Sequence, residues 1–274
     1  VNYISSRSEL LSAACYLSSF YLFIGSERGW LRALSMGLFA LGLLSKAVAV
    51  TLPLAISMHV AISADFRCAV RRSLPYWAIA LAYIAVIQSN DFLSGSLNAP
   101  VRPLIEQMWT QLKAFSYYLI LLITPVRLNV EHQFFASAGP TLAVAAAALL
   151  FVTAVGVALR VAAPRMCFWI AWAVIVALPA TAVPLNILVN EHRLYLSLAG
   201  ICILGGYVLA VMPRRVQHIA PAAIAVLVLL SIQRNEVWAT ERDLWADAVH
   251  KGPMMPRSRV HLGITLRESG EMVA

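Results

Sequence analysis

Long apolar runs, separated by short polar turns, recur along almost the whole chain. We expect eight of these runs to form membrane-spanning helices: 10–24, 31–44, 47–62, 74–88, 142–159, 166–185, 194–212 and 219–232. Several are shorter than the roughly 20 residues that a helix needs to cross about 30 Å of hydrocarbon, so flanking residues must extend them. The runs 142–159 and 166–185 are the most secure spans.

A ninth run, 104–124, is polar in its first half, where Glu106, Gln107 and Lys113 lie. If it does not cross, the arginine-bearing turns all fall on one face, which is cytoplasmic by the positive-inside rule. These arginines are Arg28, Arg32, Arg67, Arg71, Arg72, Arg160, Arg165, Arg214 and Arg215. We therefore expect the run to lie flat at the outer interface. The same parity argument splits 31–62 into two helices near Ser45 and Lys46.

The chain becomes charged after residue 232, which predicts a membrane domain over 1–233 and a water-exposed segment over 234–274. Leu262, Gly263 and Leu266 match the core of a tetratricopeptide repeat, Trp245 fits the preceding repeat, and Gly270 can form the following turn. The alternative is a single amphipathic hairpin. One repeat cannot bury its own apolar face, so we expect an α-solenoid that continues, in a chain cut at both ends. The predicted fold is all-α.

Composition supports a membrane protein and excludes other classes. The 274 residues are 61% hydrophobic and 12% charged, where about 25% charged is usual for a soluble protein. The arginine turns hold nine arginines against Glu27 and Asp65, and so carry most of the net charge of +8 without a nucleic-acid partner. The four cysteines lie far apart with no CxxC pair, which indicates neither redox chemistry nor a metal cluster.

Polar side chains gather in four clusters at the opposite, outer face, where a water-accessible reaction is expected. The clusters are 5–9, 45–46, 127–132 and 190–195. In the last, Glu191 can accept a proton, Arg193 can bind phosphate through its fork of donors, and Tyr195 can hydrogen-bond a sugar. The structural alternative is an ion pair that fixes the turn. Arg7 and Lys46 could each extend to the interface without any function.

Two Glu–His dipeptides could supply oxygen and nitrogen ligands to a divalent metal: Glu131 with His132, and Glu191 with His192. Adjacent residues do not share a helical face, so their spacing does not favour such a site. The chain has no Walker loop, HExxH or GxSxG pattern in a suitable context, which disfavours soluble hydrolases and nucleotide-binding proteins.

Read in order, VNYISSRSELLSAA, LLSKAVAVTLPL, RLNVEHQFFAS and NEHRLYLSLAG, followed by the repeat start, resemble the transmembrane and tetratricopeptide-repeat O-mannosyltransferase family and its bacterial relatives. These are glycosyltransferases of the GT-C class, and the resemblance covers nearly the whole chain. It implies transfer of mannose or another hexose from a polyprenyl-phosphate carrier to Ser or Thr of a protein. The reaction would take place on the non-cytoplasmic face of a bacterial inner membrane, where the repeats hold the acceptor.

The resemblance also implies the site. Its substrate-binding positions are Arg7, Glu9, Lys46, Glu131, His132, His192, Arg193 and Tyr195. Glu191 could contribute to catalysis, but the family's essential acidic motif is expected upstream of Val1, so this fragment is expected to be inactive. Ala47 stands where an acidic residue commonly follows the lysine, which could remove the charge partner of Lys46.

Three other functions fit the same sequence less well. A polymerase or ligase of lipid-linked glycans would use a similar membrane body with a sugar acceptor. A non-enzymatic membrane anchor would present the repeats for protein binding. A transporter is disfavoured, because the charges gather at one face and no pair of broken half-helices marks the midplane; His59, deep in a span, is expected to be a packing contact.

Overall fold

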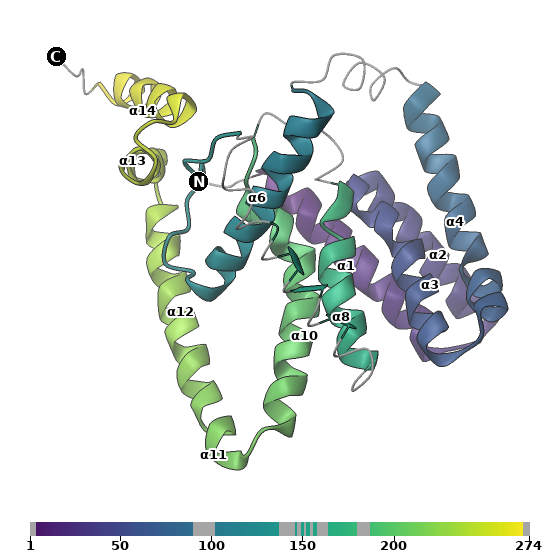
Figure 1. Cartoon of the computed structure of the whole chain (residues 1–274). Helices are drawn as coiled ribbons and strands as arrows, with labels where there is room; N and C mark the ends of the chain where they lie inside the picture. Colours follow the sequence, from purple (N-terminus) through teal and green to yellow (C-terminus); the bar gives the residue numbers. More distant parts are fainter. Residues whose placement is uncertain are drawn as a thin grey trace.

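In the computed structural model, a bundle of helices is capped at one end by a helical hairpin (Figure 1). The structure describes residues 4–89, 102–136, 164–179 and 187–270, with isolated residues between 146 and 157. This part of the chain contains helices and no strands, which confirms the predicted all-α class.

The first half of the bundle is a series of antiparallel helices. These are α1 (Ile4–Gly25), α2 (Gly29–Ser45), the 3₁₀ turn η1 (Ala47–Thr51), α3 (Leu52–Ser63) and α4 (Phe66–Ser89). Lys46, between α2 and η1, has extended backbone with φ −159° and ψ 140°. The break predicted near Ser45 and Lys46 is therefore confirmed, and Pro53 fits the first turn of the helix that follows, where its missing N–H is not needed.

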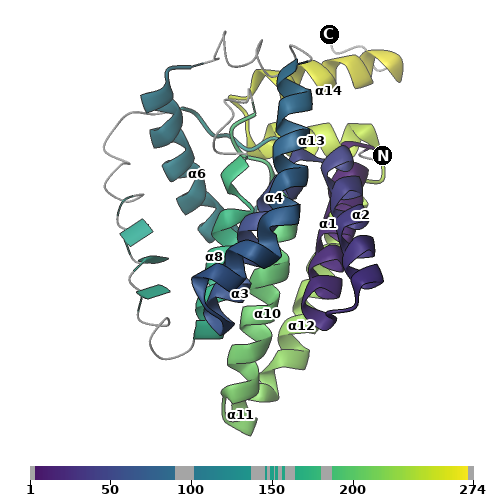
Figure 2. The ribbon, with the colours of Figure 1, turned by 90° about the vertical axis from the view of Figure 1, so that its right-hand side faces the viewer.

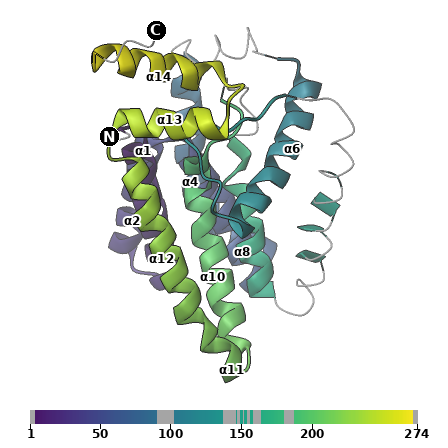
Figure 3. The same ribbon diagram turned by 90° about the vertical axis from the view of Figure 1, so that its left-hand side faces the viewer.

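In the second half, two long helices meet at a tip that lies far from the capped end (Figure 3). The elements of this half are α6 (Leu104–Ile123), α8 (Pro164–Ile175), η2 (Glu191–Leu194), α10 (Tyr195–Val211), α11 (Arg214–Gln217), α12 (Ile219–Val237), α13 (Glu241–Lys251) and α14 (Pro256–Glu268). The helix α12 continues past the boundary predicted after residue 233. The pair α13 and α14 forms the cap, with the rings of Trp245 and His261 stacked at 4.3 Å. Gly270, at φ +77°, follows α14 in the left-handed conformation that glycine adopts readily.

Four described helices are long and apolar enough to cross a membrane: Ser6–Gly25, Phe66–Ser89, Glu191–Val211 and Arg214–Val237. They indicate a membrane protein. Three shorter apolar helices, Gly29–Ser45, Ala47–Ile62 and Met166–Ile175, fall on three other predicted spans. The eighth predicted span, 142–159, lies mostly outside the described residues.

Aromatic rings and small side chains form the core of the bundle. The rings of Tyr16 and Trp172 meet edge to face at 5.1 Å, and Phe20 contacts both Trp172 and His59, which is the packing contact expected for His59. Gly200 lets α10 approach α8 so closely that a Cβ there would lie 2.7 Å from Trp172 Cδ1. Small residues give such close approach between helices in a membrane.

The helix α6 differs from its prediction. It was expected to lie flat across the outer end, but it runs obliquely along the bundle (Figure 3). After Ile123 the chain returns toward the α13–α14 hairpin as an extended segment (Figure 1). The helix α6 is not among the described helices that are long and apolar enough to cross a membrane, and its expected position outside the spans stays a prediction. Its apolar second half gives the physical reason for the oblique course, because these residues line an apolar cavity against α8 and α10.

The arginine-bearing turns lie away from the capped end (Figure 2). Arg32 and Arg72 both pair with Glu27 and so join the α1–α2 turn to the start of α4. Arg214 and Arg215 lie in α11, at the far tip. Arg160 is outside the described residues. The bundle therefore separates the end with these arginine-bearing turns from the end that carries the α13–α14 hairpin.

Candidate functional site

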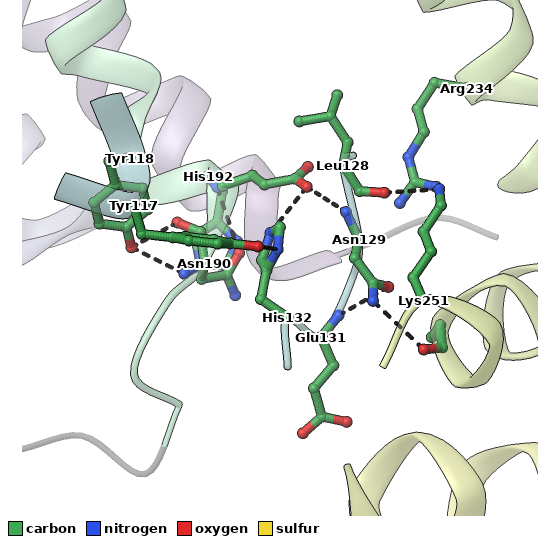
Figure 4. A network of polar contacts seen from close by, with 12 residues as sticks. Tyr117, Tyr118, Leu128, Asn129, Glu131, His132, Asn190, His192, Arg234 and Lys251 are labelled. Atoms are coloured by element: carbon green, nitrogen blue, oxygen red, sulfur yellow. Dashed lines mark hydrogen bonds and ion pairs between the residues drawn. The ribbon is translucent and has the colours of Figure 1, made fainter. Parts of the chain in front are cut away.

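Polar residues from segments far apart in the sequence meet at the hairpin end of the bundle (Figure 4). They come from the start of α1, the break at Lys46, the second half of α6, the segment 128–133 and the turn η2. These include the four clusters that the sequence predicted would share one face. The structure divides them into several separate sets of contacts.

The first set joins Glu9, Lys46 and His192. Lys46 Nζ lies 2.5 Å from Glu9 Oε1, and His192 Nε2 lies 3.9 Å from the same oxygen. Glu9 is buried, at 8% exposure, so its carboxylate depends on these partners in place of water. Ala47 does not leave Lys46 without an acidic partner, because α1 supplies one.

The second set surrounds Glu191. Its Oε1 accepts hydrogen bonds from the backbone N–H of Asn129 at 2.5 Å and from His132 Nε2 at 3.1 Å. A carboxylate only accepts, so Nε2 is the donor in this contact, and in the tautomer with the proton on Nε2 alone, Nδ1 accepts from the Tyr117 hydroxyl at 3.0 Å. Burial, together with the negative charge of Glu191, raises the pKa of Tyr117 and keeps that hydroxyl protonated. The chain of donors runs from Tyr117 through His132 to Glu191.

The turn before α10 is held by Tyr118 and by Arg193. The backbone N–H of Asn190 donates to the Tyr118 hydroxyl at 2.9 Å, and this hydroxyl donates to the Asn190 carbonyl at 3.2 Å. The two terminal nitrogens of Arg193 donate to the carbonyls of Leu188 and Ile187 at 3.2 and 2.8 Å. Arg193 thus stabilises the turn, as the structural alternative proposed, although its partners are carbonyls and not a carboxylate.

Glu131 and His132 point to different sides of their segment (Figure 4). Glu131 is buried and its Oε2 accepts a hydrogen bond from the Ser258 hydroxyl of α14 at 2.6 Å. The structure therefore brings His132 to Glu191 but directs Glu131 to the hairpin. Arg7 is exposed and Tyr195 is 48% exposed, and the described part of the chain supplies no polar partner for either side chain.

The site also contains residues that sequence reasoning missed. Tyr117 bonds to His132 and Tyr118 to Asn190 of the predicted clusters, yet neither tyrosine was a candidate. Asn129 lies within the predicted cluster 127–132 but was not singled out, although its N–H bonds to Glu191. The adjacent tyrosines lie where the polar half of α6 gives way to its apolar half, a common place for amphipathic rings at an interface. Their position at this transition is the feature of the sequence that could have identified the two tyrosines as candidates.

The arrangement does not favour the metal site. Among the described residues, no three His, Cys, Asp or Glu side chains come together as metal ligands. The reason is geometric: His132 pairs with Glu191, whereas Glu131 and His192 turn to Ser258 and Glu9.

An apolar cavity of about 200 Å³ lies between α6, α8 and α10. Tyr118, Trp169, Leu194 and Ile201 are among its lining residues, and Ser197 adds a hydroxyl-bearing side chain. Because Leu194 directly follows Arg193, the cavity begins beside the polar turn.

In comparisons with protein-family models, with curated proteins and with solved structures, nothing matches the chain. The motifs and the geometry of the site are therefore the observations that bear on function.

Proposed function

We propose that the protein is a membrane glycosyltransferase of the GT-C class. It transfers mannose or another hexose from a polyprenyl-phosphate carrier to Ser or Thr of an acceptor protein, on the non-cytoplasmic face of a bacterial plasma membrane. One observation carries the proposal: the clusters that resemble this family's motifs meet at one end of an apolar bundle, opposite the arginine turns. The hairpin at that end is the start of the repeats that hold the acceptor.

The chemistry needs a cation for the carrier phosphate and a base for the acceptor hydroxyl. As the bond between the sugar's C1 and the phosphate oxygen breaks, negative charge on the leaving phosphate is stabilised by Lys46 and Arg193. The acceptor oxygen bonds to C1 and loses its proton. Glu191 contributes to that proton transfer: its Oε1 is held by two donors, while no described residue bonds to Oε2.

The apolar cavity supports a lipid-linked donor. Its walls are almost wholly hydrophobic, and it begins next to Arg193 and Leu194. A carrier whose phosphate lies at the polar turn would place its first isoprene units against these walls. Ligand pockets of this kind combine apolar walls with a few polar groups that fix orientation.

Mass spectrometry of exported proteins tests the proposal in a strain that lacks the gene. Complementation with the full-length wild-type gene is expected to restore hexosylated Ser and Thr peptides, and Glu191→Gln in that gene to lower their yield about 10²-fold, as loss of a general base does. Arg28→Ala is the matched control, since Arg28 is exposed at the opposite end. Protein hexosylation that persists in the deletion strain, or full activity of Glu191→Gln, contradicts the proposal.

A non-enzymatic anchor is the second candidate, and the contacts of Arg193 favour it, because both terminal nitrogens already bond to the protein's own backbone. That function predicts that Glu191→Gln is tolerated and that loss of the hairpin is not. A glycan polymerase or ligase would instead alter lipid-linked glycans in the deletion strain and leave protein hexosylation intact.

A further inference from the structure

Residues 128–133, here called the connector loop, contact the site and the hairpin at once. On the site side, the Asn129 N–H and the His132 ring both bond to Glu191. On the other side, Lys251 Nζ donates to the Leu128 carbonyl at 2.9 Å. The loop therefore connects the hairpin directly to the groups that hold Glu191.

The hairpin contacts continue along the loop. The Asn129 side chain donates to the Ala248 carbonyl at 3.4 Å, and the Met254 N–H donates to Gln133 Oε1 at 3.2 Å. Gly252 lies so close that a Cβ on it would be 3.3 Å from the Glu131 carbonyl oxygen. The backbones of loop and hairpin are thus in contact, and little displacement of one is possible without the other.

The contact between Glu131 and Ser258 joins a buried carboxylate of the loop to a buried hydroxyl of the hairpin. Glu131 is 6% exposed and Ser258 is fully buried, with 2.6 Å between their oxygens. A buried carboxylate that loses its donor keeps the full cost of desolvation, and it recovers water only if the loop moves. Asn129 and His132 flank Glu131 within the same short loop, so such a movement displaces the donors to Glu191.

We propose that the α13–α14 hairpin sets the position of Glu191 through the connector loop, with Glu131 and Ser258 as positioning residues. This gives Glu131 a role different from the substrate binding that the family resemblance implies. It rests on the proposed function for the catalytic meaning of Glu191. It also adds a regulatory consequence: an acceptor that binds the hairpin acts on the site through the same loop.

Hydrogen–deuterium exchange of the purified protein in detergent tests this without an activity assay. Ser258→Ala is expected to speed amide exchange about ten-fold in peptides covering 127–135 and also in those covering 187–194, because a hydrogen bond to a charged group changes a local opening equilibrium by at least that factor. Ser269→Ala, directly after α14, is the matched control, since among the described residues its hydroxyl bonds only to the Leu266 carbonyl. Its exchange in both segments should equal that of the wild type.

Faster exchange in 127–135 with no change in 187–194 would overturn the proposal, and so would no change in either segment. If Ser258→Ala fails to elute as a folded species, Glu131→Gln replaces it; its amide still accepts the hydrogen bond without the charge, so the same two segments should loosen to a smaller extent. Loosening of both segments in a protein that transfers no sugar would leave this coupling standing and remove the proposed function alone.

Discussion

The pair formed by Glu9 and Lys46 offers a quantitative test of the site's construction. Lys46→Met removes the cation 2.5 Å from a carboxylate whose side chain is 10% exposed, while the lysine side chain is 34% exposed. Breaking a fully buried pair costs about 3 to 5 kcal/mol. Because Lys46 is partly exposed, we expect a loss of about 2 kcal/mol in the free energy of unfolding.

A double-mutant cycle separates this contact from general damage. Glu9→Gln should cost about 1 kcal/mol, since the neutral amide still accepts a hydrogen bond. The double variant should then lose about 1 kcal/mol less than the two single losses together, as expected for groups in contact. Unfolding by dodecyl sulfate in mixed micelles, followed by tryptophan fluorescence, measures all four proteins. Additivity within about 0.3 kcal/mol would refute the argument that Glu9 is the partner of Lys46.

Two further substitutions test the packing of α10 and the turn before it. Gly200→Ala should destabilise the protein by about 1 to 3 kcal/mol, because the new methyl overlaps Trp172, whereas Gly205→Ala, with no neighbour within 4 Å, should be neutral or slightly stabilising in the same unfolding assay. In the full-length protein, Arg193→Ala should abolish hexose transfer and leave membrane insertion intact, and Arg193→Lys should not restore transfer, because a single ammonium cannot reproduce the fork that bonds two carbonyls. Glycopeptide yield and membrane fractionation check this, and normal transfer by either variant would remove Arg193 from the site.

The separation of polar clusters from arginine turns was predictable from the sequence. Hydropathy and charge are properties of consecutive residues. The break at Lys46 and the position of the arginine turns therefore follow from local composition and from the number of spans between the turns. The inclination of α6 did not follow, because hydropathy identifies the apolar half of a helix without its packing partner. The apolar second half of α6 packs along the cavity next to α8 and α10 and does not lie flat at the membrane interface, where it was expected.

Individual contacts in the site depend on tertiary structure. The sequence pointed to Glu9 and Lys46 as separate candidates, but their pairing requires α1 and the end of α2 to lie side by side. In the same way, adjacent residues Glu131 and His132 act on different partners, because the extended connector loop directs them to opposite sides. A dipeptide motif cannot show which side each residue faces.

The central claim is that the polar end faces the non-cytoplasmic compartment. Its most direct test is to measure which end of the bundle can be labelled from outside the cell. In a variant whose native cysteines are replaced, Met254→Cys, 65% exposed in the wild type, places a probe on the hairpin, and Arg215→Cys places one at the far tip. A membrane-impermeant maleimide added to intact cells should label position 254 and should label position 215 only after lysis. Labelling of position 215 in intact cells, with position 254 protected until lysis, would contradict the account.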